Sequence, residues 1–173
     1  RVVRDKIAHQ SRVLLTRARE DQGELLSKIV PEVRSGDPTN REGHAARLYF
    51  TALFGPSFSR DDDIPLNAAL NYGYAILLSA VNREIVARGF LTQTGICHRN
   101  EYNQFNLSCD LMEPFRPIVD RIVFDEFDGD FTKDTKLMLV DMLNQSIPYR
   151  GGSYRVASVI SLYVADCLKA LGK

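Results

Sequence analysis

The chain has 173 residues, carries 22 Lys and Arg against 22 Asp and Glu, and is 45% hydrophobic. This length and composition exclude a disordered chain, and the formal net charge of zero excludes a uniformly basic nucleic-acid binder, although not a local basic face. No membrane-spanning apolar run, signal peptide or CxxC pair is present, so we expect a soluble, cytoplasmic protein without a membrane partner, a disulfide framework or a structural zinc site.

Apolar residues recur at helical spacing along most of the chain. Asp37-Pro38 is typical of a helix start, and Gly55-Pro56 and Gly89 are typical of helix ends. The predicted helices cover about residues 1–19, 23–33, 38–53, 65–88, 108–127, 132–143 and 153–171, with Pro31 able to end the second early and Pro117 to kink the fifth. We therefore predict one all-α domain of six or seven helices over residues 1–173.

A carboxylate lies one turn into the third predicted helix, where Glu42 is followed by Gly43. A glycine costs a helix about 0.5–1 kcal/mol relative to alanine, so the close approach of another group would explain Gly43. Glu42 by itself is also explained as a complement to the positive end of the helix.

Two further segments hold polar residues that core packing does not explain. His98 lies in an Asn-rich loop, and Asp110 and Glu113 lie on one face near a helix start. Each segment also has an ordinary explanation. His98 could be a structural or solvated histidine, and Asp110 and Glu113 could be carboxylates that cap the first turn of a helix. Together, the carboxylates and the imidazole are ligand types that hold an ion of the Mg²⁺ or Mn²⁺ class, which could activate a nucleophile beside a phosphodiester.

The absence of several other motifs narrows the range of possible functions. The sequence has no GxxxxGK[ST], GxGxxG, GxSxG, HExxH or EF-hand pattern, so nucleotide hydrolysis, hydride transfer and serine-esterase chemistry lack their usual residues. The run from Arg60 to Asp63 is interpreted as a solvated loop, with a metal role as the alternative.

Several motifs resemble those of a known family in their order along the chain. They are Glu42–Phe50 ending in Leu53-Phe54-Gly55, Asn67–Tyr74, Gly95–His98 with Asn106-Leu107, and Asp110–Pro117. These segments resemble the CRISPR-associated endonuclease/integrase of spacer acquisition, the first Cas protein of the adaptation module, and are most similar to its type II branch. The resemblance covers nearly the whole chain.

The resemblance implies an N-terminal β domain followed by a helical catalytic domain, and this chain, which does not begin with Met, resembles the second alone. It implies a divalent ion, Mg²⁺ or Mn²⁺, held by Glu42, His98 and Glu113. Asp110 is a fourth candidate, because many relatives carry Asp where this sequence has Glu113.

The implied reaction joins the 3′-hydroxyl ends of short foreign DNA to the borders of a CRISPR repeat by transesterification. The implied partners are double-stranded DNA, a second copy in a homodimer and the second Cas protein of the module. Arg99, Arg116 and Arg150 are candidate DNA contacts, with surface solvation as the alternative for each. The zero net charge predicts that this chain alone binds DNA weakly. A non-catalytic helical scaffold for dimerisation or DNA docking and, more remotely, a phosphohydrolase of another helical class are the competing functions.

Overall fold

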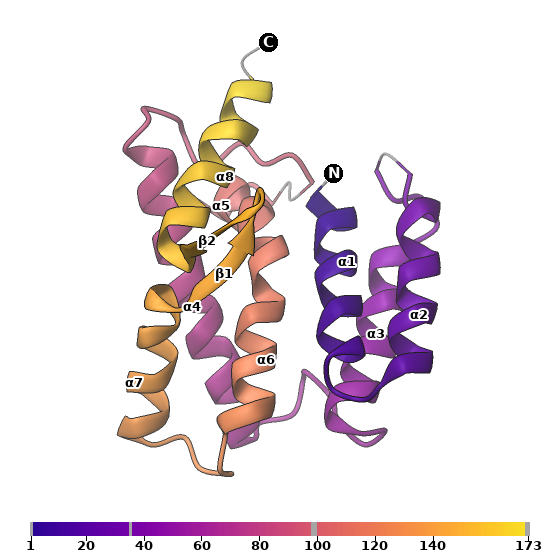
Figure 1. Cartoon of the computed structure of the whole chain (residues 1–173). Helices are drawn as coiled ribbons and strands as arrows, with labels where there is room; N and C mark the ends of the chain where they lie inside the picture. The colour runs from indigo at the N-terminus through magenta and orange to yellow at the C-terminus, as the bar shows by residue number, and fades with distance from the viewer. Residues whose placement is uncertain (1, 35, 98–99, 172–173) are drawn as a thin grey trace.

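The computed structural model describes residues 2–34, 36–97 and 100–171, and helices dominate these ranges (Figure 1). The α-helices are α1 (Val2–Leu15), α2 (Glu20–Ile29), α3 (Arg41–Phe54), α4 (Pro65–Val86), α5 (Asn106–Met112), α6 (Arg116–Glu126), α7 (Lys133–Asp141) and α8 (Val156–Leu171). Short 3₁₀ turns cover Val30–Glu32, Glu113–Phe115 and Met142–Asn144, and one antiparallel hairpin joins β1 (Ser146–Tyr149) to β2 (Gly152–Arg155). The predicted helical fold class is confirmed, and no helix within these ranges is long and apolar enough to cross a membrane.

Two separate apolar clusters divide the molecule into two parts, which Figure 1 shows side by side. The first part, α1 to α3, packs around fully buried side chains such as Ile7, Leu26 and Tyr49. The second part, α4 to α8, surrounds α4, whose Leu70, Leu77 and Ile85 are fully buried. We call these parts the α1–α3 half and the α4–α8 half, and the boundary between them the seam.

Aromatic side chains hold the two halves together where α3 ends. Phe54 packs on Phe58, with ring centroids 4.9 Å apart, and reaches Phe124 of α6 at 6.2 Å. Phe50 lies 5.7 Å from Phe58, so the loop that leaves α3 is packed against the helix it has just left. Arg60 then binds the side chains of Asn67 and Asn71 at the start of α4.

The start of α3 differs from its predicted position. The helix begins at Arg41, and Asn40, with φ 49°, accepts a hydrogen bond from Gly43 N at 3.2 Å. Asp37, three residues earlier in the chain, is a second capping residue. Its carboxylate accepts hydrogen bonds from the backbone amides of Arg41 and Glu42 at 2.9 and 2.8 Å. A Cβ on Gly43 would lie 2.6 Å from Asn40 Oδ1, which confirms the close approach that the sequence predicted there.

Two elements in the second half also differ from the prediction. The helix predicted over residues 108–127 is divided by the 3₁₀ turn Glu113–Phe115, which contains Pro114. The hairpin was not predicted; its turn has positive φ at Arg150 and Gly151. By contrast, α2 ends at Ile29 before a 3₁₀ turn that contains Pro31, as the sequence indicated.

Candidate functional site

Two of the predicted site carboxylates meet across the seam on one lysine. Lys6 of α1 places its Nζ 2.7 Å from Glu42 Oε1 and 2.6 Å from Glu113 Oε2. Glu42 lies in the first turn of α3, and Glu113 begins the 3₁₀ turn between α5 and α6. Three segments far apart in the sequence, from both halves of the molecule, therefore converge on a single cation.

Burial and charge act in opposite directions on this lysine. Its side chain is 13% exposed, and that of Glu113 is 7% exposed. Burial lowers the pKa of Lys6, but the charges of Glu113 and Glu42 outweigh it, so the pKa is raised above the ordinary value. Lys6 is thus a charged ammonium at neutral pH, held between two acidic side chains.

Glu113 has a second cationic partner. Arg116, one turn further along, places Nε 3.0 Å from Glu113 Oε1, and its guanidinium lies 4.7 Å from the ring centroid of Tyr74. Arg116, which the sequence predicted as a DNA contact, therefore also helps to orient the Glu113 carboxylate.

A carboxyl that the sequence analysis did not single out lies deeper in the same region. Asp120 of α6 is fully buried and accepts a hydrogen bond from the Tyr74 hydroxyl. Burial raises its pKa to about 6, although the tyrosine hydrogen bonds and Arg116 act to lower it. Burial, followed by the Asp120 carboxylate, in turn raises the pKa of Tyr74 and of Tyr49 well above the ordinary value. The signal in the sequence was an acidic residue between apolar Val119 and Ile122 on a helix face that is otherwise buried.

Asp110 lies on α5, three residues before Glu113. It is 1% exposed, and its Oδ2 accepts from the backbone amides of Ile96 and Cys97 at 2.5 and 2.9 Å. Those amides immediately precede His98, so Asp110 fastens the segment that leads to the predicted imidazole. His98 and Arg99 themselves lie outside the described residues.

The remaining predicted residues lie elsewhere. Arg150, in the hairpin turn, pairs with Asp166 and lies 5.2 Å from the ring centroid of Tyr149. Asp61, Asp62 and Asp63 are exposed, as the solvated-loop interpretation predicts. Over residues 2–34, 36–97 and 100–171, no group of three or more His, Cys, Asp or Glu side chains is arranged to hold a metal ion.

The donor chemistry of the site nevertheless fits a hard divalent cation. Glu42 and Glu113 both direct an oxygen at the same ammonium, so the protein already gathers two carboxylates around one positive charge. Mg²⁺ and Mn²⁺ prefer such oxygen ligands and take one or two carboxylates with water and phosphate oxygens. An ion bound by both glutamates would replace the Lys6 ammonium as their shared partner.

Comparisons with known proteins agree with the motifs. The family model described as "CRISPR associated protein Cas1" matches residues 1–137. A CRISPR-associated endonuclease Cas1 from Neisseria meningitidis is 38% identical over 170 residues, which cover 95% of this chain and 56% of that protein. A CRISPR-associated endonuclease Cas1 1 from Francisella tularensis subsp. novicida is 27% identical over 90% of this chain and 55% of its own length. The chain thus spans a little over half of these two relatives.

Solved structures share the fold at lower sequence identity. A CAS1 protein from Thermotoga maritima superposes with a TM-score of 0.71 at 16% identity, over 98% of this chain and 64% of that one. A casposase bound to its integration product gives a TM-score of 0.70 at 22% identity, over 96% of this chain and 60% of that one. The family match over most of the chain, supported by the Neisseria relative, shows that this chain belongs to the Cas1 family.

Proposed function

We propose that this chain is the catalytic part of a metal-dependent DNA endonuclease/integrase that inserts short foreign DNA into a CRISPR array. The observation that carries the proposal is the convergence of Glu42 and Glu113, from opposite sides of the seam, on one cationic position. Relatives described as CRISPR-associated endonucleases, and a structural neighbour bound to an integration product, support the same reaction class.

In the proposed site, Glu42, Glu113 and His98 bind Mg²⁺ or Mn²⁺. The bound ion would stabilise the negative charge that develops on a phosphodiester during in-line displacement. Arg116 holds the Glu113 carboxylate from its other oxygen, and Asp110 fastens the backbone just before His98. The protein's own side chains therefore fix the direction of the ligands.

The reaction needs no covalent enzyme intermediate. The 3′-hydroxyl oxygen of the incoming DNA forms a bond to a phosphorus of the repeat, and the bond from that phosphorus to the repeat's own 3′-oxygen breaks. The attacking hydroxyl loses its proton, and the departing 3′-oxygen gains one, so the number of phosphodiester bonds is conserved. A reaction without a covalent enzyme intermediate fits a site that is built from carboxylates and cations.

The proposed partners follow from the same assignment. They are double-stranded DNA, a second copy of the protein and the second Cas protein of the adaptation module, in the cytoplasm. Structural neighbours titled as a Cas6-RT-Cas1–Cas2 complex, one with a TM-score of 0.63 at 22% identity, support the Cas2 partner.

The test is strand joining by the full-length protein with its Cas2 partner. A short duplex with free 3′-hydroxyl ends is mixed with a repeat-bearing plasmid in Mn²⁺, Mg²⁺ or chelator. We expect joining only with metal, and a loss of at least about a hundredfold in Glu113→Gln, since several kcal/mol of charge stabilisation is removed. Glu126→Gln, at an exposed glutamate that ends α6, is the matched control.

His98→Ala tests the third ligand separately. Joining that survives this substitution would contradict the ligand assignment while leaving the reaction intact. A wild-type complex that binds DNA but joins nothing would favour the alternative, a non-catalytic helical scaffold for dimerisation or DNA docking.

A further inference from the structure

A buried polar group lies beneath the candidate site, where the two halves of the molecule meet. Asp120 of α6 is fully buried and accepts a hydrogen bond from the Tyr74 hydroxyl of α4. Tyr49 of α3 is equally buried in the core of the α1–α3 half, and its pKa is raised by burial and then by the Asp120 carboxylate. One carboxyl of α6 therefore acts on a tyrosine from each half.

The ring of Tyr74 links this carboxyl to the Glu113 side chain. The Arg116 guanidinium lies 4.7 Å from the ring centroid, and Arg116 Nε lies 3.0 Å from Glu113 Oε1. A phenol that donates to a carboxylate becomes richer in electron density, which strengthens the attraction of its ring for a cation. Contacts therefore run without a break from the buried carboxyl of Asp120 to that of Glu113.

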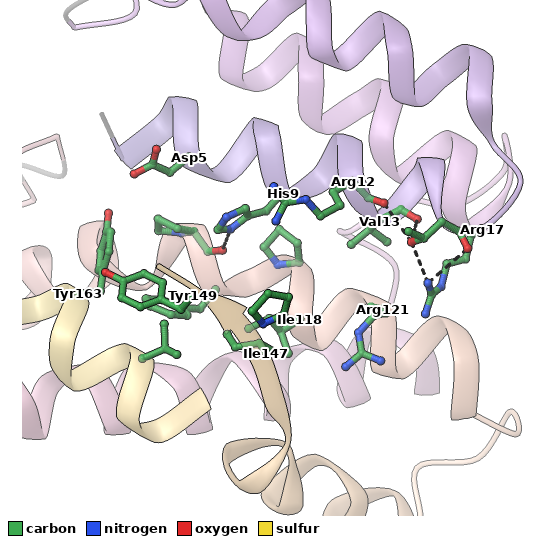
Figure 2. A pocket seen from close by; sticks show the side chains of 16 residues that line it. Asp5, His9, Arg12, Val13, Arg17, Ile118, Arg121, Ile147, Tyr149 and Tyr163 are labelled. Carbon is green, nitrogen blue, oxygen red and sulfur yellow. Dashed lines mark hydrogen bonds between the residues drawn. The ribbon is translucent and has the colours of Figure 1, made fainter. Parts of the chain in front are cut away.

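The backbone that carries Glu113 is fixed separately. His9, whose ring lines a cavity of about 570 Å³ beside α1 (Figure 2), donates from Nδ1 to the carbonyl oxygen of Pro114 at 2.6 Å. Pro114 directly follows Glu113, so this hydrogen bond ties the turn to α1. With the backbone held, the direction of the Glu113 carboxylate depends on the partners of its side chain, Lys6 and Arg116.

These two cations also interact with Asp120. Burial raises the pKa of Asp120 to about 6, whereas the hydrogen bonds of the tyrosines and the positive charges of Arg116 and Lys6 act to lower it. The interaction is mutual, so the ionised Asp120 stabilises both cations in the positions that orient Glu113. Its charge also attracts any further positive charge that gathers at Glu42 and Glu113.

We propose that Asp120 is a positioning residue of the proposed ion site. It fixes the direction of the Glu113 carboxylate through the ring of Tyr74 and the guanidinium of Arg116, and its negative charge favours a divalent cation beside that carboxylate. A carboxyl that only filled space would be costly here, because burying a charge without a function is less favourable than burying an apolar side chain. The proposal rests on the metal-dependent function proposed above.

The test measures ion binding without DNA, so that no reaction is needed. Full-length protein is titrated with Mn²⁺, and the free ion is followed by electron paramagnetic resonance at several pH values. Binding that remains in Glu113→Gln is subtracted. At about pH 7.5 we expect Asp120→Asn to weaken Mn²⁺ binding about tenfold, because the amide keeps the shape of the carboxylate but not its charge.

The pH dependence separates positioning from an ordinary structural role. Asp120 is neutral below its pKa of about 6 and charged above it, so wild type and Asp120→Asn should agree within about twofold at about pH 5 and differ about tenfold at about pH 7.5. The ion ligands titrate in both proteins, and their contribution cancels in the ratio. The charged and titratable groups that face Asp120 remain in the variant, and they are Lys6 of α1, Tyr49 of α3, Tyr74 of α4 and Arg116 at the start of α6.

Tyr74→Phe is a second variant that interrupts the same series of contacts. It keeps the ring for Arg116 but removes the hydroxyl, and it should weaken Mn²⁺ binding about threefold. Asp134→Asn, which removes a carboxylate at an exposed position of α7, is the matched control for net charge and should bind as the wild type does. Circular dichroism at each pH identifies any variant that has not folded.

The wild-type protein gives a further measurement without any substitution. Carboxyl-labelled aspartate is followed by ¹³C NMR with and without Mg²⁺, and the raised pKa of Asp120 separates its signal from those of the exposed aspartates. Because linkage is reciprocal, a tenfold effect on ion affinity requires Mg²⁺ to lower the pKa of Asp120 by about one unit. An unchanged midpoint would overturn the proposal.

The outcomes distinguish this proposal from the proposed function. Equal Mn²⁺ affinity of wild type and Asp120→Asn, or a loss that is the same at every pH, would overturn the positioning role. If that result accompanies normal strand joining by the wild type, the proposed function stands. If ion binding shows the expected pH dependence but the wild-type complex joins no DNA, only the proposed function is contradicted.

Discussion

Each half of the molecule encloses its own apolar cluster, whereas the two halves meet through aromatic contacts at one end of the seam and through polar contacts along the rest. The α4–α8 half encloses the larger cluster, and the α1–α3 half has its own core around Ile7, Leu26 and Tyr49. Across the seam, Lys6 meets Glu113, His9 meets Pro114 and Arg17 meets Asp125. Each half has a core of its own, whereas the candidate site lies where the two halves meet.

The comparison explains why the site is built from charges. A charged group inside either core would lose its hydration without compensation, whereas at the seam Lys6 meets Glu113 and Arg17 meets Asp125 from the opposite half. The contacts that position Glu42 and Glu113 are therefore also the contacts that hold the halves in register.

The largest effect is expected from removing the shared cation. Lys6→Met leaves the nearly buried Glu113 without one of its partners and two carboxylates facing each other, so the free energy of unfolding in chelator should fall by about 3–5 kcal/mol. Mg²⁺ should then stabilise the variant more than the wild type, because the ion no longer competes with the ammonium. Urea titrations with and without Mg²⁺ measure both effects, with Lys28→Met at an exposed position of α2 as the control. A loss below about 1 kcal/mol would show that Lys6 contributes little to joining the halves.

The buried carboxyl at Asp120 makes stability depend on pH. Its pKa in the folded protein is raised from 3.8 to about 6, so the stabilising protonated form is fully present below about pH 4 and is lost as the pH rises through 6. The wild type should lose roughly 3 kcal/mol relative to Asp120→Asn between about pH 4 and pH 7. Urea titrations across this range test the difference, with exposed Asp63→Asn as the control. Parallel pH profiles for wild type and Asp120→Asn would contradict the assignment.

A substitution inside the larger core should act without affecting the seam. A Cβ on Gly73 of α4 would lie 2.5 Å from Val119 Cγ1, so Gly73→Ala should cost about 1–2 kcal/mol despite the better helix propensity of alanine. Joining activity per folded molecule should stay at the wild-type level. Ser79→Ala, at an exposed position of α4, provides the comparison in thermal unfolding. An activity loss larger than the folded fraction explains would mean that the core and the site are coupled.

The smallest effect is expected at the half-exposed end of the seam. Arg17 and Asp125 form a two-point ion pair with side chains 20% and 28% exposed, so their coupling should be about 0.5–1 kcal/mol. A double-mutant cycle with Arg17→Ala and Asp125→Ala measures it, and 0.5 M salt should reduce it. Coupling above about 2 kcal/mol would contradict the small contribution that the exposure of this pair predicts.

The sequence predicted most of the helices because their apolar spacing is regular, and its motifs singled out Glu42 and Glu113 as candidate site residues. It could not predict that Lys6 lies between them, since this depends on how α1 packs against α3 and the Glu113 turn. Asp120 was overlooked because a single acidic residue in a helix usually faces solvent. Asp110 was considered as a ligand, but its contact with the Ile96 and Cys97 amides depends on where the preceding loop folds back.

Short-range geometry accounts for the other differences. Two four-residue strands that contain Pro148 and Gly152 carry too little alternation to be recognised in the sequence. α3 begins later than predicted because Asp37 and Asn40 are both good capping residues. Only the folded chain shows how the two side chains share the free backbone amides at the start of the helix.

The aromatic group of Phe50, Phe54, Phe58 and Phe124 gives the seam a pivot at one end. Glu42 lies near the opposite end of α3, 12 residues or about 18 Å from Phe54 along the helix. A rotation of about 5° at the rings would move Glu42 by roughly 1.6 Å relative to Glu113, most of a metal–oxygen bond length of about 2 Å. A change in the angle between the halves, whether caused by a second subunit or by bound DNA, would therefore change the separation of Glu42 and Glu113 and with it the affinity of the proposed ion site.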